Sequence, residues 1–177
     1  MKTKLERGLV EVYTGNGKGK TSAAFGLALR ATGRGLRVYI IQFIKGGFDY
    51  GELYAVKKLT GLKLKAFGRG KFVSEKRPDK EDIDLAEQAL RTAEKAVKSG
   101  KYDVVVLDEV NVALNLGLIK VENVLRLIRE KPVETELVLT GRKAPKEIIE
   151  AADLVTEMLE IKHPYNSGFE ARKGIEY

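Results

Sequence analysis

The chain contains 177 residues, of which 44% are hydrophobic and 32% are charged, so its composition predicts an ordinary soluble globular protein with a sizeable core. Cysteine is absent, which excludes disulfides, thiolate catalysis and cysteine metal sites. The net charge is +7, but the lysines are spread along the chain without a dense basic block. We therefore expect a solvated basic surface and a pocket for a polyanionic small molecule, with no nucleic-acid partner.

Membrane and secretion signals are not visible in the sequence. No apolar run approaches the roughly 18 residues of a membrane span, so no membrane partner is expected. The N-terminal segment MKTKLERG carries charge but lacks the apolar stretch of a secretory signal. These two observations predict a cytoplasmic location.

Segments typical of strands and helices alternate from the N-terminus onward. A strand is expected over 9–14, followed directly by a helix over 20–34 whose alanines and leucine recur at helical spacing. The near-continuous apolar run over 37–44 predicts a strand buried on both faces of a sheet. The alternating residues of 62–67 predict an outer strand.

The second half of the chain continues this alternation. Its expected elements are a helix that starts after Asp79 and ends before Gly100, a buried strand at 103–109, a helix near 120–130, a buried strand at 136–141, a short helix after Pro145 and a last strand at 154–161. The remaining tail looks irregular and is a candidate functional segment. The whole pattern predicts one α/β domain over residues 1–177, with a mainly parallel sheet and helices on both faces.

The segment TGNGKGKT, residues 14–21, joins the first strand to the first helix. A glycine-rich turn before a helix forms a nest of backbone N–H groups that binds phosphate, and the helix N-terminus adds partial positive charge. Lys20 can reach the terminal phosphates, and the Thr21 hydroxyl can bind Mg²⁺. The usual motif would place its first glycine at residue 14, which is Thr14, so the pattern is displaced by one position. The loop nevertheless predicts a P-loop NTPase-like domain that binds a nucleoside triphosphate.

Two carboxylates, Asp108 and Glu109, follow the buried strand at 103–109. Ligands of open α/β sheets bind at the carboxyl ends of the strands, so these side chains are candidates to hold Mg²⁺ opposite Thr21. In ATP hydrolases an adjacent glutamate often positions water. Arg142 follows another strand and has two interpretations. It either contacts phosphate or substrate, or it is a surface arginine in a turn.

Four further residues carry less specific signals. His163 is the single histidine and cannot form a histidine metal cluster, so we interpret it as a packed or surface residue. Tyr165 and Tyr177 are interpreted as packing residues. Arg30 lies in the first helix, either near the nucleotide or on a solvated face.

The motifs together resemble the P-loop type of ATP:corrinoid adenosyltransferase, also called cob(I)alamin adenosyltransferase. The resemblance covers nearly the whole chain. Its segments, in order, are TGNGKGKTSAAFG (14–26), QFIKG (42–46) followed by Gly51 and Glu52, VVVLDE (104–109), TGR (140–142) with AADLVTE (151–157), and the ending from KH (162–163) to GIEY (174–177). The GNGKGKT form of the loop accounts for the displaced first glycine.

The resemblance implies a P-loop fold, a homodimer and a specific reaction. The 5′-deoxyadenosyl group of ATP moves to the Co(I) centre of a reduced corrinoid, and triphosphate leaves, as part of adenosylcobalamin synthesis or salvage. An electron-donor flavoprotein is an implied partner, because the cobalt must first be reduced. The cofactor expected is Mg²⁺, with ATP and the corrinoid as substrates.

The resemblance also implies roles for single residues. Lys20, Thr21 and Glu109 are the expected catalytic residues, and Thr21 and Glu109, then Asp108, are the expected Mg²⁺ ligands. The expected ATP-binding residues are Gly15, Asn16, Gly17, Lys18, Gly19, Lys20, Thr21, Ser22 and Arg30. The expected corrinoid-binding residues are Phe72, Lys45 and Arg142.

One segment departs from the family pattern. The aromatic-rich stretch that commonly excludes a lower axial ligand from cobalt corresponds here to GRGKFV, residues 68–73, where the tryptophan is missing and Phe72 is the one aromatic residue. This segment belongs to the aperiodic stretch 68–79, whose length favours a functional loop. The competing interpretations are a P-loop ATPase acting on nucleic acid, a small-molecule kinase, and a nucleotide-binding or corrinoid-carrying module without turnover.

Overall fold

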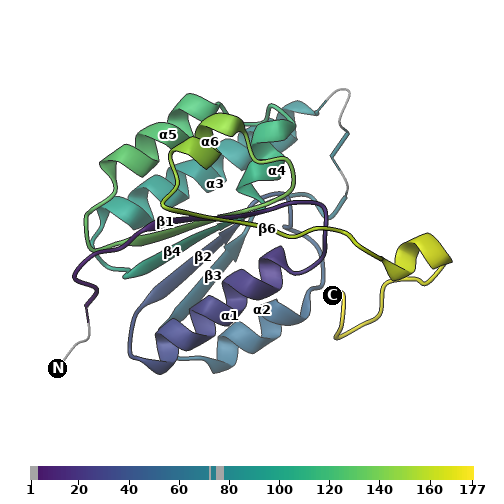
Figure 1. Cartoon of the computed structure of the whole chain (residues 1–177), viewed down its shortest axis with the longest axis horizontal. Coiled ribbons are helices and arrows are strands. Elements are labelled where there is room, and N and C mark those ends of the chain that lie inside the picture. Colours follow the sequence, from purple (N-terminus) through teal and green to yellow (C-terminus); the bar gives the residue numbers. More distant parts are fainter. Residues whose placement is uncertain (1–3, 72, 75–77) are drawn as a thin grey trace.

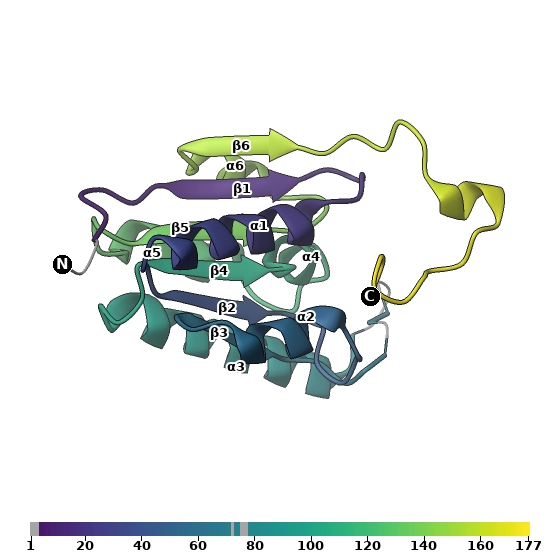
Figure 2. The ribbon, with the colours of Figure 1, turned by 90° about the horizontal axis from the view of Figure 1, so that it is seen from below.

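Six parallel strands form one sheet in the computed structural model, which describes residues 4–71, 73–74 and 78–177. The order across the sheet is β3-β2-β4-β5-β1-β6 (Figures 1 and 2). The strands are β1 (Val10–Thr14), β2 (Val38–Gln42), β3 (Leu62–Ala66), β4 (Val104–Asp108), β5 (Glu136–Thr140) and β6 (Leu154–Glu157). All five strand pairs are parallel, so every strand ends at the same edge, and the expected mainly parallel sheet is confirmed.

Helices cover both faces of the sheet, as expected (Figure 1). One face carries α1 (Lys20–Gly33) and α2 (Gly51–Ala55), followed by a 3₁₀ turn at Val56–Lys58. The other face carries α3 (Lys80–Lys98), α4 (Val110–Asn115), α5 (Val121–Glu130) and α6 (Lys146–Glu150). Each helix connects two strands or lies after one, which gives the crossovers that parallel strands need.

Two apolar clusters hold these layers together. On the α1 face, Ala24 and Ala28 pack in a cluster with Val38 and Val106 of the central strands. On the opposite face, a larger cluster joins α3, α4, α5 and α6 to the sheet. All five residues of β2 and of β4 are buried, as the near-continuous apolar runs predicted. The alternating strand β3 lies at the edge, also as predicted.

The structure corrects some boundaries and adds elements. Strand β6 ends at Glu157 rather than near residue 161, because its partner β1 ends at Thr14 and turns into the glycine-rich loop. The short helices α2 and α4 were not expected, since five or six residues are too few to show a helical period.

Arg69 fixes the beginning of the aperiodic segment 68–79 to the start of α3. Its guanidinium pairs with Asp82 at 2.5 Å, with Asp79 at 2.6 Å and with Glu81 at 3.2 Å. Acidic residues in the first turn also complement the helix dipole. Phe72, a predicted corrinoid ligand, lies outside the described residues, so its contact with a corrinoid stays a prediction.

Glu136 at the start of β5 makes stability depend on pH. Burial, together with the hydrogen bond that protonated Glu136 donates to the neighbouring Glu11, raises the pKa of Glu136 from its ordinary value of 4.5 to about 7, although the Leu9 N–H donates to Glu136 at 2.7 Å. A raised carboxyl pKa favours the protonated folded state, so this stability is complete below about pH 4.5 and is lost as the pH rises through 7.

We therefore expect the free energy of unfolding of the wild-type protein to decrease between pH 5 and pH 8. Glu136→Gln should make this decrease smaller by about 1 kcal/mol, allowing for solvent screening. Urea unfolding at several pH values measures this. Glu134→Gln, at an exposed neighbouring position, is the control and should keep the wild-type slope. Equal slopes in wild type and Glu136→Gln would contradict the assignment.

No helix in the described part of the chain is both long enough and apolar enough to span a membrane.

Candidate functional site

The glycine-rich loop connects the end of β1 to the start of α1, at the carboxyl edge of the sheet (Figure 2). Gly15 and Gly19 have φ angles of 90° and 122°, which favour glycine. A Cβ atom at Gly15 would lie 2.4 Å from the Met158 carbonyl oxygen. The Gly17 N–H donates to that same carbonyl at 2.7 Å. The glycines are therefore required by the close backbone after β6 as well as by the open anion nest.

The Lys20 side chain holds this loop through hydrogen bonds to its backbone. Its Nζ donates to the carbonyls of Gly15 and Gly17, both at 2.7 Å, and its side chain is buried. Burial lowers the pKa of Lys20, and the nearby Glu109 charge opposes that shift. The ammonium group is thus held at the loop, beside the position where the backbone nest would bind phosphate.

Asp108 is fully buried and accepts four hydrogen bonds. Its Oδ1 accepts from the hydroxyls of Thr21 at 2.9 Å and Thr140 at 2.7 Å. Its Oδ2 accepts from Gln42 Nε2 at 3.0 Å and from Lys45 Nζ at 2.9 Å. Gln42 is the register partner of Asp108 on the adjacent strand, so the sheet itself sets this contact. Burial opposes ionisation, but Lys45 and the hydroxyl and amide donors together hold the pKa of Asp108 below its usual range.

Glu109 turns its backbone sharply at the end of β4. Its φ is 61°, a left-handed conformation that costs a non-glycine residue about 1–3 kcal/mol and is concentrated at functional sites. Its N–H donates to the Thr140 hydroxyl at 2.9 Å. Burial first, then the charge of Asp108, raises the pKa of Glu109. The turn aims its carboxylate into the cavity above the loop.

A cavity of about 510 Å³ lies over the loop, a size typical of ligand pockets. Of the residues predicted from the sequence, it brings together Gly17, Lys18, Gly19, Lys20, Thr21, Ser22, Lys45, Glu109 and Arg142. Asp108 lies beneath it, bonded to Thr21. Gly15 and Asn16 do not line it, and neither does Arg30, which is ten residues along α1, or about 15 Å, from Lys20. A role for Arg30 in ATP binding stays a prediction.

Several residues that line the cavity were given no site role from the sequence. Tyr50, Gly51 and Glu52 enter from the start of α2, and Gly174–Tyr177 enter from the tail. The Lys45 ammonium lies 5.5 Å from the Tyr50 ring centre. Gly51, Glu52 and the final four residues do belong to segments that carry the family resemblance, and this was the available signal.

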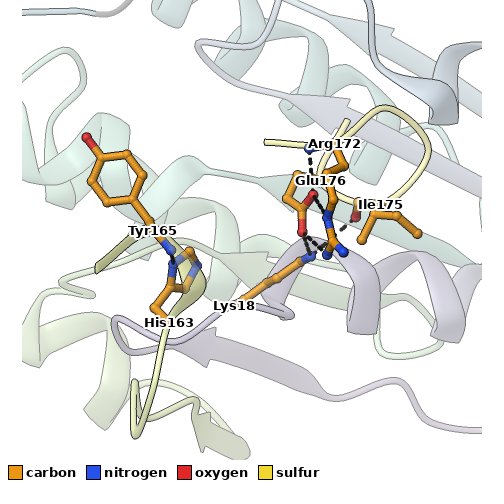
Figure 3. Close-up of polar contacts among 6 residues, drawn as sticks. All are labelled: Lys18, His163, Tyr165, Arg172, Ile175 and Glu176. Carbon is orange, nitrogen blue, oxygen red and sulfur yellow. Dashed lines mark hydrogen bonds and ion pairs between the residues drawn. The ribbon is translucent and has the colours of Figure 1, made fainter. Parts of the chain in front are cut away.

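The C-terminal tail returns to the glycine-rich loop (Figure 3). Lys18 Nζ pairs with Glu176 at 2.9 Å and donates to the Ile175 carbonyl at 3.3 Å. Glu176 also accepts from Arg172 side-chain and backbone nitrogens, which lowers the pKa of Glu176 to about 2. The tail therefore forms one wall of the cavity, which supports its selection as a candidate functional segment.

The aromatic residues of the tail are not packed as expected. Tyr165 is 76% exposed and Tyr177 is 41% exposed, so interpreting them as packing residues was wrong. Tyr177 lines the cavity instead, as does His163, whose Nδ1 accepts from the Tyr165 N–H at 3.2 Å. The short 3₁₀ helix Pro164–Ser167 carries Tyr165 away from the core, which explains its exposure.

Glu176 is expected to control how firmly the tail is held. Glu176→Ala removes the acceptor shared by Lys18 and Arg172, so trypsin should cut after Arg172 and Lys173 several-fold faster than in wild type. Mass spectrometry over a digestion time course measures this. Glu170→Ala, at an exposed position in the same tail, is the matched control. Equal cleavage rates in the two variants would show that the Glu176 contacts do not hold the tail.

The oxygen atoms of Thr21, Asp108 and Glu109 fit a magnesium ion. Mg²⁺ prefers oxygen ligands and is usually held by one or two carboxylates together with substrate phosphates. The described residues contain no group of three or more His, Cys, Asp or Glu side chains arranged for a metal. The donor set therefore suits a metal that arrives with a nucleotide rather than one enclosed by protein alone.

Comparisons with known proteins give a consistent result. Residues 6–177 match the family described as ATP:corrinoid adenosyltransferase BtuR/CobO/CobP. A corrinoid adenosyltransferase of Sinorhizobium sp. is 41% identical over 175 residues, covering 97% of this chain and 81% of that protein. The Pseudomonas aeruginosa protein of the same name is 40% identical over 173 residues, covering 97% and 85%. The Escherichia coli K12 corrinoid adenosyltransferase is 34% identical over 172 residues, covering 97% and 87%.

Proposed function

The chain belongs to the ATP:corrinoid adenosyltransferase BtuR/CobO/CobP family and is an enzyme that adenosylates corrinoids with ATP, and from this premise we propose how its cavity performs the reaction. The supporting observation is the convergence of the P-loop, Lys20 and the Thr21–Asp108 pair on one cavity at the carboxyl edge of the sheet. Neither the nucleic-acid ATPase nor the small-molecule kinase is favoured by these findings.

The P-loop half of the cavity binds the triphosphate of ATP. Backbone N–H groups of the loop and the N-terminus of α1 face the phosphates, and Lys20 supplies a positive charge. Mg²⁺ would be held by Thr21 and Glu109, with Asp108 behind Thr21, and would neutralise charge on the triphosphate. Gly15, Asn16 and Ser22 complete the proposed nucleotide site.

The chemistry requires no general base from the protein. Co(I) of the reduced corrinoid donates its electron pair to C5′ of ATP, so a cobalt–carbon bond forms as the C5′–oxygen bond breaks. Triphosphate leaves with the bonding electrons and carries the added negative charge. The work of Lys20, Thr21 and the loop is therefore to orient C5′ and to stabilise the departing triphosphate.

The corrinoid and the partner proteins complete the proposal. The corrinoid lies at the mouth of the cavity, where Arg142 is exposed, and Lys45 and Phe72 stay predicted contacts. An electron-donor flavoprotein supplies the Co(I) state, and the enzyme acts as a cytoplasmic homodimer in which residues 1–177 form one catalytic domain.

The reaction is tested anaerobically with ATP, Mg²⁺ and chemically reduced cobalamin. Loss of the Co(I) absorbance with formation of adenosylcobalamin and an equal amount of triphosphate supports the proposal. Formation of ADP and phosphate with unchanged corrinoid would instead identify an ATPase or a kinase.

A further inference from the structure

Lys45 occupies a position that a metal ion would need. Its Nζ lies 2.9 Å from Thr21 Oγ1 and 2.9 Å from Asp108 Oδ2, so one ammonium bridges two of the proposed Mg²⁺ ligands. The Lys45 side chain is 14% exposed and the Asp108 side chain is fully buried. This contact is therefore a desolvated ion pair and not a loose surface pair.

The hydroxyl of Thr21 shows why the ammonium and a metal compete. Its one proton is donated to Asp108 Oδ1, and a lone pair accepts from Lys45. A metal bound to Thr21 would also need an oxygen lone pair. Two cations on one oxygen atom, in a site shielded from water, repel each other strongly. Lys45 must therefore give up its contact with Thr21 before a metal binds there.

The charge balance of the cavity points the same way. Four basic side chains line the cavity, and they are matched by three acidic side chains of the lining and by the buried Asp108 beneath it: Lys18, Lys20, Lys45 and Arg142 against Glu52, Glu109 and Glu176. The protein alone thus offers a divalent cation no excess of negative charge. A bound triphosphate supplies that excess directly over the P-loop.

We propose that Lys45 is a resident cation that holds the Thr21–Asp108 pair in the nucleotide-free enzyme and excludes Mg²⁺ until ATP is present, so that the metal enters with the nucleotide. This inference rests on the proposed function, because it takes the triphosphate to be the ligand of the loop. Lys45 acts here as a positioning residue: it holds the Thr21 hydroxyl and the Asp108 carboxylate in place, and it yields its place to the metal.

Binding of Mn²⁺, followed by its electron paramagnetic resonance signal, tests the proposal without turnover. Without nucleotide, Lys45→Met should bind Mn²⁺ at least about tenfold more tightly than wild type, because the competing charge is gone. Lys45→Arg keeps the charge and should stay as weak as wild type. Lys101→Met removes an exposed, distant charge and serves as the matched control. Equal affinities in wild type and Lys45→Met would overturn the inference.

A measurement on the wild-type protein covers the case in which Lys45→Met does not fold. The signal of the Lys45 ammonium group is observed by ¹⁵N NMR and is assigned by its loss in Lys45→Arg. This signal should not change when Mg²⁺ alone is added. It should shift on adding Mg²⁺ with ATP, beyond the change caused by ATP in EDTA. An ammonium signal unaffected by Mg²⁺ with ATP would overturn the inference.

The two proposals fail in different ways. Wild-type protein that binds no Mn²⁺ even with ATP would refute the proposed nucleotide–metal site. Wild-type protein that binds Mn²⁺ with ATP, and equally well without it, would refute only the role of Lys45.

Discussion

Lys20→Ala is expected to abolish adenosyl transfer in practice, lowering kcat/KM on the order of a thousandfold. Lys20 is the buried cation of the P-loop, and its Nζ bonds to the carbonyls of Gly15 and Gly17. Alanine removes both the loop contacts and the positive charge that stabilises the departing triphosphate. Charge on the triphosphate grows as the C5′–oxygen bond breaks, so kcat should fall as well as ATP affinity.

The measurement is anaerobic kinetics with reduced cobalamin, combined with calorimetric ATP binding. Lys20→Arg is the matched variant, and it should also be severely impaired, because a planar guanidinium does not fit between two carbonyls that each lie 2.7 Å from a compact ammonium. Thermal unfolding should show that both variants remain folded. Retention of more than about a tenth of the wild-type kcat/KM by Lys20→Ala would refute the role of Lys20 in stabilising the triphosphate.

Local patterns were sufficient to predict most of the fold. Strands β2, β4 and β5 are short apolar runs buried on both faces, and α1 and α3 show a clear helical period. The P-loop was recognisable because its chemistry depends on neighbouring residues, from Gly15 to Thr21. Here sequence and structure agree because the physical requirement acts over a few residues.

The rest of the site depends on contacts between distant parts of the chain. Lys45 contacts Asp108 across 63 positions, and Lys18 contacts Glu176 across 158. The family resemblance placed Lys45 in the QFIKG segment and implied a corrinoid contact, but no local pattern predicts its contacts with Thr21 and Asp108. Its role depends on where the chain turns after β2, beside the end of β4, and this is a property of strand order. The left-handed backbone of Glu109 is equally invisible in the sequence.

The glycines of the loop show a second limit of sequence reasoning. The sequence explained them by the backbone nest that binds phosphate, which is a general property of such loops. The structure adds a constraint, because the Gly17 N–H bonds to Met158 and a Cβ atom at Gly17 would lie 2.6 Å from the Leu159 carbonyl oxygen. The loop is therefore held in shape by the backbone that leaves β6.

Asp108→Asn is expected to destabilise the folded protein by about 3–5 kcal/mol, the usual cost of breaking a buried ion pair on one side. Asparagine nearly preserves the shape of the side chain, but the Lys45 ammonium then lies desolvated without its counter-charge. In asparagine an NH₂ donor also replaces one carboxylate oxygen. That donor would face groups that already donate hydrogen bonds to Asp108, namely two hydroxyls, an amide and an ammonium. Urea unfolding at neutral pH measures the loss.

The double variant Asp108→Asn with Lys45→Met separates the charge effect from the hydrogen-bond effect. If the unpaired ammonium dominates, removing it should recover about half or more of the lost stability, so the two substitutions would be strongly non-additive. A double variant as unstable as the sum of the two single variants would show that the hydroxyl and amide contacts dominate instead.

The sign of the pH effect gives an independent check. Because the pKa of Asp108 is lowered in the folded state, its contribution is present at neutral pH and is lost on acidification, and this acid-dependent loss should be absent in Asp108→Asn.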